Sequence, residues 1–208
     1  MAYFKCSKNT QKPSVKIVAD WDFNREYPRI DSVNGYELIT NNNTWSTLVI
    51  DGRTYLNMKS TGTIYVKIPS DLYFNFNANY TSLSYAIDFY RYNGGVHVID
   101  ASKNFQGNSA GIGVQVLDRK YYFYNPESSS YRKISDSFRE FDESILTYKI
   151  EKVSNNTAQI KILKDDDLIF TSNEFTKEQL DLYKDVISIG SRIDSAQLYL
   201  AGLKVITE

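Results

Sequence analysis

The chain has 208 residues and a mass of 24.0 kDa, with 24 Lys and Arg against 25 Asp and Glu, so its formal charge is −1. This length suits one large β-domain or two small ones, and the balanced, mixed charges give no reason to expect a partner in nucleic acid or an anionic membrane. The single cysteine, Cys6, excludes an internal disulfide and a Cys-cluster metal site, and the absence of an 18-residue apolar run excludes a membrane-spanning helix.

Residues 1–14 are polar, carry Pro13 and show no periodicity, so we expect a tail or linker there. The residues that open the chain also lack the apolar stretch of a secretion signal. After them, runs of alternating apolar residues are separated by turn clusters such as Asp51-Gly52, which suits the positive φ angles of a tight hairpin. Strands are predicted over residues 15–23, 36–40, 45–50, 55–60, 63–68, 82–92, 96–101, 111–118, 120–125, 131–134, 145–152, 157–163, 168–171, 186–191 and 197–205.

One short helix is predicted near residues 177–184. Thr176 and Gln179 have the spacing of a capping box, and Phe175 and Leu180 can close a hydrophobic staple around the first turn. A series of short strands with one short helix excludes a parallel α/β sheet. We therefore predict one all-β domain over residues 15–208, a two-sheet antiparallel jelly-roll sandwich.

The strand pattern of the last third of the chain resembles the concanavalin A-like lectin and laminin-G superfamily. Its elements are the pair 146–150 and 159–163, followed by 168–170, 186–190 and 198–205, and residues 85–90 resemble the early central strand of that family. The similarity lies in the pattern of strands and includes no site motif, so it implies a fold rather than a function. Gly190 and Gly202 agree with it, because a small residue inside a strand lets another backbone or ring approach closely.

The opening Met1-Ala2-Tyr3-Phe4-Lys5-Cys6 is similar to the start of small structural proteins of tailed phages and prophages. Together with the missing secretion signal, this similarity implies a virion-associated protein that meets cell-surface glycans without being exported. We accordingly expect an extracellular or virion location, with other virion or surface proteins among the partners.

The motifs of catalysis are incomplete. Some glycanases with this fold carry three carboxylates on one strand, where a period of two directs them into one cleft. Here Glu140 and Asp142 share a face but Glu143 lies on the other, and His97, the only histidine, has no triad spacing around it. We predict that the domain is not an enzyme and that His97 is a packed or surface residue.

Calcium is a common partner of this fold, bound by carboxylate and carbonyl oxygens of loops. The densest acidic cluster, residues 165–167, lacks the Asp-x-Asp-x-Asp-Gly spacing of a calcium loop and is typical of a soluble hairpin turn. We predict no cofactor, with calcium as the alternative.

The 17 tyrosines favour strands, and their rings can also stack on a sugar while the hydroxyl bonds to it. Alternation turns Asp88, Tyr90 and Tyr92 outward, and we expect Gln115 to share that outward side. In residues 120–125, either Tyr122 and Tyr124 or Tyr121 and Phe123 must point outward. The ligand-binding residues predicted on a concave outer face are Asp88, Tyr90, Tyr92, Gln115, Tyr122 and Tyr124.

These residues predict a carbohydrate-binding or adhesion module that contacts a glycan or cell-surface polysaccharide. The alternative is a structural module that packs against other proteins of a virion or surface assembly, or against its own copies as a homo-oligomer. A glycoside hydrolase is the third interpretation.

Overall fold

The computed structural model describes residues 14–26, 28–40, 46–59, 66–93, 95–102, 111–117, 120–126, 130–135, 143–191 and 197–208. Apart from Ser14, the predicted tail lies outside these ranges. The described residues form strands that pair antiparallel throughout, with one α-helix and one 3-10 helix between them.

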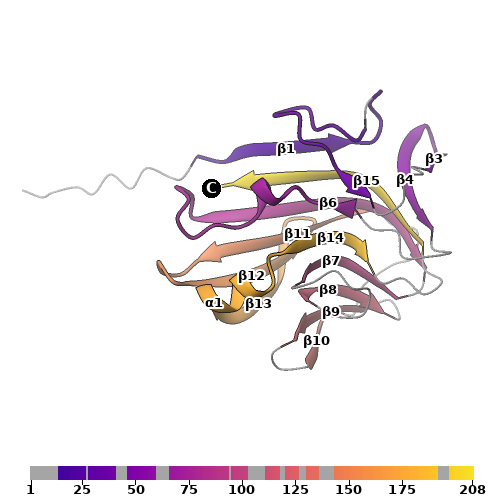
Figure 1. Cartoon of the computed structure of the whole chain (residues 1–208). Coiled ribbons are helices and arrows are strands. Elements are labelled where there is room, and N and C mark those ends of the chain that lie inside the picture. Colours follow the sequence, from indigo (N-terminus) through magenta and orange to yellow (C-terminus); the bar gives the residue numbers. More distant parts are fainter. Residues whose placement is uncertain are drawn as a thin grey trace, which may run out of the picture.

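The strands form two sheets (Figure 1). Across the first sheet the order is β13 (Asp167–Thr176), β12 (Thr157–Lys164), β11 (Glu143–Lys152), β6 (Ser82–Asn93), β15 (Gln197–Thr207), β4 (Arg53–Lys59) and β3 (Thr47–Ile50), and β1 (Lys16–Asp22) pairs with β15. Across the second sheet the order is β10 (Ser130–Ser135), β9 (Lys120–Asn125), β8 (Ile112–Leu117), β7 (Val96–Ser102), β14 (Val186–Ser191), β5 (Val66–Lys67) and β2 (Ile39–Thr40). The predicted all-β, two-sheet antiparallel sandwich is confirmed.

The core lies between the sheets because the side chains of each strand alternate between its two sides. In β11, Leu146 and Tyr148 are buried, whereas Thr147 and Lys149 lie on the outer side. In β9, Tyr121 and Phe123 are buried, so Tyr122 and Tyr124 point outward, which resolves the alternative that the sequence left open. The ring of Phe123 lies 4.8 Å from that of Phe170 in the other sheet and joins the two layers.

Helix α1 (Lys177–Leu182) begins at the predicted capping box. The Thr176 hydroxyl accepts a hydrogen bond from the Gln179 amide at 3.2 Å, and the Gln179 side chain accepts one from the Thr176 amide at 2.8 Å. The helix ends two residues before the predicted boundary, where the Tyr183 amide bonds to the Leu180 carbonyl.

Both glycines that the sequence analysis singled out lie where another group comes close. Gly190 has a φ of +72°, and a Cβ there would lie 2.4 Å from the Met58 methyl group. A Cβ at Gly202 would lie 3.2 Å from the Trp21 carbonyl oxygen. Close approach explains both residues, as expected.

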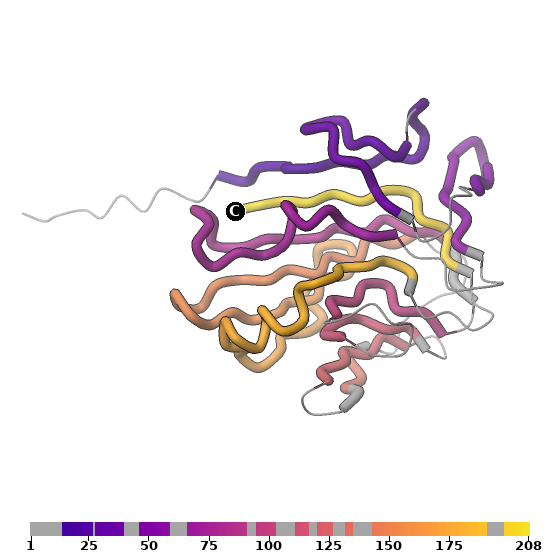
Figure 2. The backbone as a smooth tube through the Cα atoms, in the orientation of Figure 1, coloured from indigo at the N-terminus to yellow at the C-terminus, as the bar shows by residue number. Residues whose placement is uncertain are grey.

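The segment over residues 69–81 contains a 3-10 helix, η1 (Ser70–Leu72), which the sequence analysis did not predict because three residues carry no periodicity. The buried Tyr85 hydroxyl donates a hydrogen bond to the Leu72 carbonyl at 2.8 Å and fixes the segment to the core. The segment lies at the same end of the sandwich as α1 and the C-terminus (Figure 2).

Candidate functional site

The predicted site residues divide between the two sheets. Asp88 and Tyr90 lie on the outer side of the first sheet, because their neighbours in β6 point into the core. Gln115, Tyr122 and Tyr124 lie on the outer side of the second sheet for the same reason. The two outer sides of a sandwich face opposite directions, so the expectation of one shared face is corrected. Tyr92 also belongs to β6, but its side chain lies outside the described residues.

On the second sheet, the pairing of three strands aligns polar and aromatic groups on the outer side. Tyr122 of β9 lies opposite Gln115 of β8, which lies opposite His97 of β7. In the next row, Tyr124 and Asp100 lie opposite Gly113 from its two sides. Directly opposite residues share a face. We call this surface, made by Tyr122, Tyr124, Gln115, His97 and Asp100, the tyrosine face.

A β-bulge in β7 places His97 and Asp100 on the same side. The register with β8 shifts between His97 and Ile99, and His97 Nδ1 then lies 3.9 Å from Asp100 Oδ2. A Cβ at Gly113 would lie 2.2 Å from the Ile99 carbonyl oxygen, so this close approach requires glycine. The other carboxylate oxygen of Asp100 accepts a hydrogen bond from the Gly111 amide at 2.8 Å.

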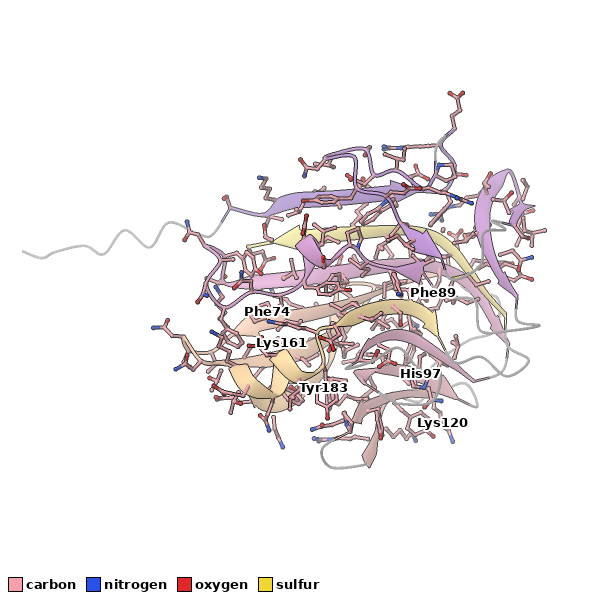
Figure 3. All side chains as sticks on the ribbon, in the orientation of Figure 1. Phe74, Phe89, His97, Lys120, Lys161 and Tyr183 are labelled. Carbon is pink, nitrogen blue, oxygen red and sulfur yellow. The ribbon has the colours of Figure 1, made fainter. Side chains whose placement is uncertain are left out.

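Burial separates the members of the tyrosine face into two groups. The side chains of His97 and Asp100 are 5% and 2% exposed, so a large ligand cannot contact them directly. His97 is labelled in Figure 3. Tyr122, Tyr124 and Gln115 are only partly buried and can offer ring faces, hydroxyls and an amide to a ligand. His97 is packed, which is one of the two predicted alternatives, but its partner Asp100 was missed. The sequence feature that could have identified Asp100 is a carboxylate between the apolar residues Ile99 and Ala101. The following strand candidate contains a glycine, Gly113, which pairs with it.

On the outer side of the first sheet, a groove of about 600 Å³ runs over β1, β15, β6 and β11. Small side chains of Ala86, Gly202 and Thr147 line it between charged residues, and Asp88 lines it too. We call it the charged groove.

Asp88 belongs to a network that involves three strands of this sheet. Arg53 donates hydrogen bonds to Asp88 Oδ2 at 2.5 Å and to Glu143 Oε1 at 2.9 Å. The Tyr55 hydroxyl donates to the same Glu143 oxygen at 2.6 Å, and the Tyr55 ring lies 5.4 Å from that of Tyr90. Arg53 also lies over the Tyr55 ring, at 5.6 Å from its centroid. We call these five residues the Arg53 cluster.

The hydrogen bonds and the burial of the cluster shift the pKa values of its acidic groups. The hydrogen bond from Tyr55 and the bond from Arg53 lower the pKa of Glu143, although its partial burial acts in the opposite direction. Burial raises the pKa of Asp88 in spite of Arg53 beside it. Burial and the Glu143 carboxylate together raise the pKa of Tyr55 to about 12. Glu143 is therefore ionised at neutral pH and bound by two donors. Its predicted companions, Glu140 and Asp142, lie outside the described residues.

The acidic cluster at residues 165–167 forms a hairpin turn. Asp165 and Asp166 have φ angles of 50° and 70°, and an Asp165 carboxylate oxygen accepts a hydrogen bond from the Ile145 amide at 2.8 Å. Within the described ranges, no three His, Cys, Asp or Glu side chains gather as metal-ion ligands. The helices in that same part of the chain are too short or too polar to cross a membrane.

No protein-family model matches the chain, and no curated protein sequence is similar to it. Among solved structures, the fold is similar to that of botulinum neurotoxin type C, whose cell entry depends on interaction with two ganglioside molecules (TM-score 0.57, 16% identity, 91% of this chain and 47% of that one). It is also similar to the binding domain of botulinum neurotoxin DC in complex with rat synaptotagmin II (TM-score 0.57, 14% identity, 91% and 47%). This chain spans about half the length of those toxin chains.

A third similar structure matches over nearly its whole length. It is domain 4 of AbnA, a GH43 extracellular arabinanase from Geobacillus stearothermophilus, in complex with arabinotriose (TM-score 0.58, 9% identity, 94% of both chains). At these identities the comparisons show a shared β-sandwich fold.

Proposed function

We propose that this domain is a non-catalytic carbohydrate-binding or adhesion module and that the tyrosine face contacts the glycan. The observation that carries the proposal is that two partly exposed tyrosines, Tyr122 and Tyr124, lie beside the partly exposed Gln115 amide on one side of two neighbouring strands, with His97 and Asp100 buried next to them. A sugar presents an apolar ring face surrounded by hydroxyls, so it needs aromatic surface and hydrogen-bonding groups side by side. The tyrosine face offers both.

The comparisons support the proposal at the level of class. One similar domain is described in complex with arabinotriose, and another belongs to a toxin that interacts with gangliosides. The further proposals of a concanavalin A-like or laminin-G-like domain, a phage virion and an extracellular location rest on the resemblances of the sequence. We also retain the proposal that binding needs no cofactor.

Binding is tested by a glycan array, followed by calorimetric titration with the oligosaccharides that give a signal. We expect Tyr122→Ala and Tyr124→Ala each to weaken binding about ten-fold, since one aromatic contact contributes up to about 1.5 kcal/mol. Tyr90→Ala is the matched control, because it removes the same side chain from the opposite outer side and should leave the affinity unchanged. An array without signal, or equal losses in all three variants, would refute the assignment to the tyrosine face.

A protein–protein interaction module is the second candidate, and one observation favours it. Ile17, Ile145 and Leu168 on the outer side of the first sheet are 41%, 43% and 57% exposed. Together with the charged groove, they could pack against another protein of a virion or surface assembly, or against a second copy. A stable oligomer in light scattering, combined with silence on every glycan, would favour this candidate. Glycoside hydrolysis gains no support from Glu143, whose carboxylate is bound by Arg53 and Tyr55.

A further inference from the structure

The segment over residues 69–81 is held in a defined shape although it is mostly irregular. The Ile187 amide donates a hydrogen bond to the Tyr73 hydroxyl at 3.1 Å, and Lys152 Nζ donates one to the Ala78 carbonyl at 2.6 Å. Within the segment, the Asn75 amide donates to the Tyr80 hydroxyl at 2.7 Å. These bonds tie the segment to both sheets, so the surface that it presents is formed before any ligand arrives.

Three aromatic rings give this segment an apolar surface. The Phe74 ring lies 5.0 Å from that of Phe76 in an edge-to-face arrangement and 6.0 Å from that of Tyr80. The Lys152 ammonium lies 4.8 Å from the centroid of the Tyr80 ring and further fixes it. All three rings are only partly buried, so part of each remains open to a ligand.

A cleft of about 750 Å³ is lined both by these rings and by residues of α1 (Phe74 is labelled in Figure 3). Helix α1 and the residues after it contribute Lys177, Asp181, Lys184 and Asp185 to its lining, and η1 contributes Asp71. The Lys184 ammonium bonds to the Asp181 carboxylate at 2.8 Å, whereas Asp71 and Asp185 are exposed to solvent. We call this space, bounded by residues 70–80 and 177–185, the end cleft.

We propose that the end cleft is a second ligand-binding site, distinct from the tyrosine face, and that its ligand is a neutral oligosaccharide. Its volume falls in the range of about 300–1,000 Å³ that small-molecule sites occupy. Three carboxylates and two ammonium groups nearly balance, which disfavours a strongly charged ligand of either sign. Ring surface together with exposed acceptors and donors in one cleft matches the two kinds of surface that a sugar presents.

The site is tested on the full chain by two-dimensional amide NMR, with arabinotriose, xylotriose, cellotriose and maltotriose as probes. We expect at least one trisaccharide to shift the signals of residues 70–80 and 177–185. Phe76→Ala should weaken that binding about ten-fold. Asp71→Ala should weaken it about three-fold. Because Asp71 is exposed, its replacement should leave the fold intact, so this variant tests the site even if Phe76→Ala unfolds the protein. Asp167→Ala, at an exposed position of the distant hairpin turn, is the matched control and should bind as the unchanged protein does.

The same spectra separate this proposal from that of the tyrosine face. A Tyr122→Ala/Tyr124→Ala double variant should keep the shifts in residues 70–80 and 177–185 unchanged. The proposal is overturned if no trisaccharide shifts these residues at millimolar concentration. It is equally overturned if only a cationic probe such as tetramethylammonium shifts them, because the ligand would then be a cation bound by the carboxylates and rings.

Discussion

Replacing Arg53 by methionine tests how much the Arg53 cluster on the outer side of the first sheet contributes to stability. Methionine keeps most of the unbranched length of the side chain and removes its charge. The change leaves Asp88, only 26% exposed, without the guanidinium 2.5 Å away, and removes one of the two donors that bind Glu143. The Asp88 carboxylate must then find solvent or bind a proton, and either costs free energy of folding.

The magnitude follows from how far the pair is buried. An exposed ion pair contributes up to about 1 kcal/mol, whereas breaking a buried one costs about 3–5 kcal/mol. The Arg53 side chain is 33% exposed and its stronger partner is less exposed still, so the pair lies between these limits. Glu143 is 51% exposed and adds little. We expect Arg53→Met to lower the free energy of unfolding by about 2 kcal/mol, which for a chain of this size lowers Tm by roughly 4–8 °C.

Urea unfolding at pH 7, followed by far-ultraviolet circular dichroism, measures this loss. Adding Asp88→Asn to Arg53→Met should recover about half of it, because the uncompensated charge is then gone. Arg25→Met is the matched control, since the Arg25–Asp22 pair is 3.8 Å long and both side chains are more than 40% exposed. The reasoning fails if Arg53→Met lowers the free energy of unfolding no more than Arg25→Met does. It also fails if adding Asp88→Asn to Arg53→Met lowers the free energy of unfolding further.

Three further changes test the core, the bulge and the pH dependence. Trp21→Phe should cost about 2 kcal/mol in urea unfolding, because the fully buried indole N–H bonds to two carbonyls at 3.1 and 3.0 Å. Gly113→Ala should lower the free energy of unfolding by more than about 3 kcal/mol, since its Cβ would lie 2.2 Å from a carbonyl oxygen of β7. Gly35→Ala is the comparison and should lower it by only about 1 kcal/mol, because open space surrounds Gly35 and only its φ of +75° opposes a side chain. Lys149 lowers the pKa of Glu208 below its ordinary 4.5, so the folded protein binds that proton less tightly than the unfolded chain. The stabilisation from this ion pair is therefore complete above pH 4.5 and is lost as the pH falls below it. In urea unfolding at a series of pH values, Lys149→Met should lower the free energy of unfolding at pH 7 but progressively less below pH 4.5.

The sequence predicts the fold well because its main signals are local. Alternation of apolar residues in β11 and β12 and the turn clusters between strands define where each strand lies and which side it buries. Strand β13 runs to Thr176, beyond the predicted end at residue 171, because the polar Asn173 and Glu174 conceal a strand that pairs along one edge with β12. Pairing with a neighbouring strand there outweighs local composition.

The site was predictable only in part, because alternation tells which way a side chain points and not which sheet its strand joins. Asp88 and Gln115 both point outward as predicted, but β6 pairs with β11 and β15 in one sheet, whereas β8 pairs with β7 and β9 in the other. Such non-local pairing also brings Arg53 to Asp88, 35 positions away. His97 and Asp100 lie on the same side of β7 only because of a β-bulge. A bulge changes the register without a distinctive sequence, so this placement could not be predicted.

The two proposed binding sites, if both bind sugar, have a consequence for affinity that a single site lacks. The tyrosine face lies on the outer side of β7, β8 and β9, and the end cleft lies between the segment 69–81 and α1, so no residue is shared. A polysaccharide long enough to reach both sites binds the second from a high effective concentration, and such linkage raises apparent affinity about 10²–10⁴-fold. A trisaccharide cannot gain in this way. Removing either site alone, by Tyr122→Ala or by Phe76→Ala, should therefore lower the apparent affinity for the polysaccharide to about that for a trisaccharide. If the two sites act independently, each variant would instead lower the number of bound chains and leave the affinity of the remaining site unchanged.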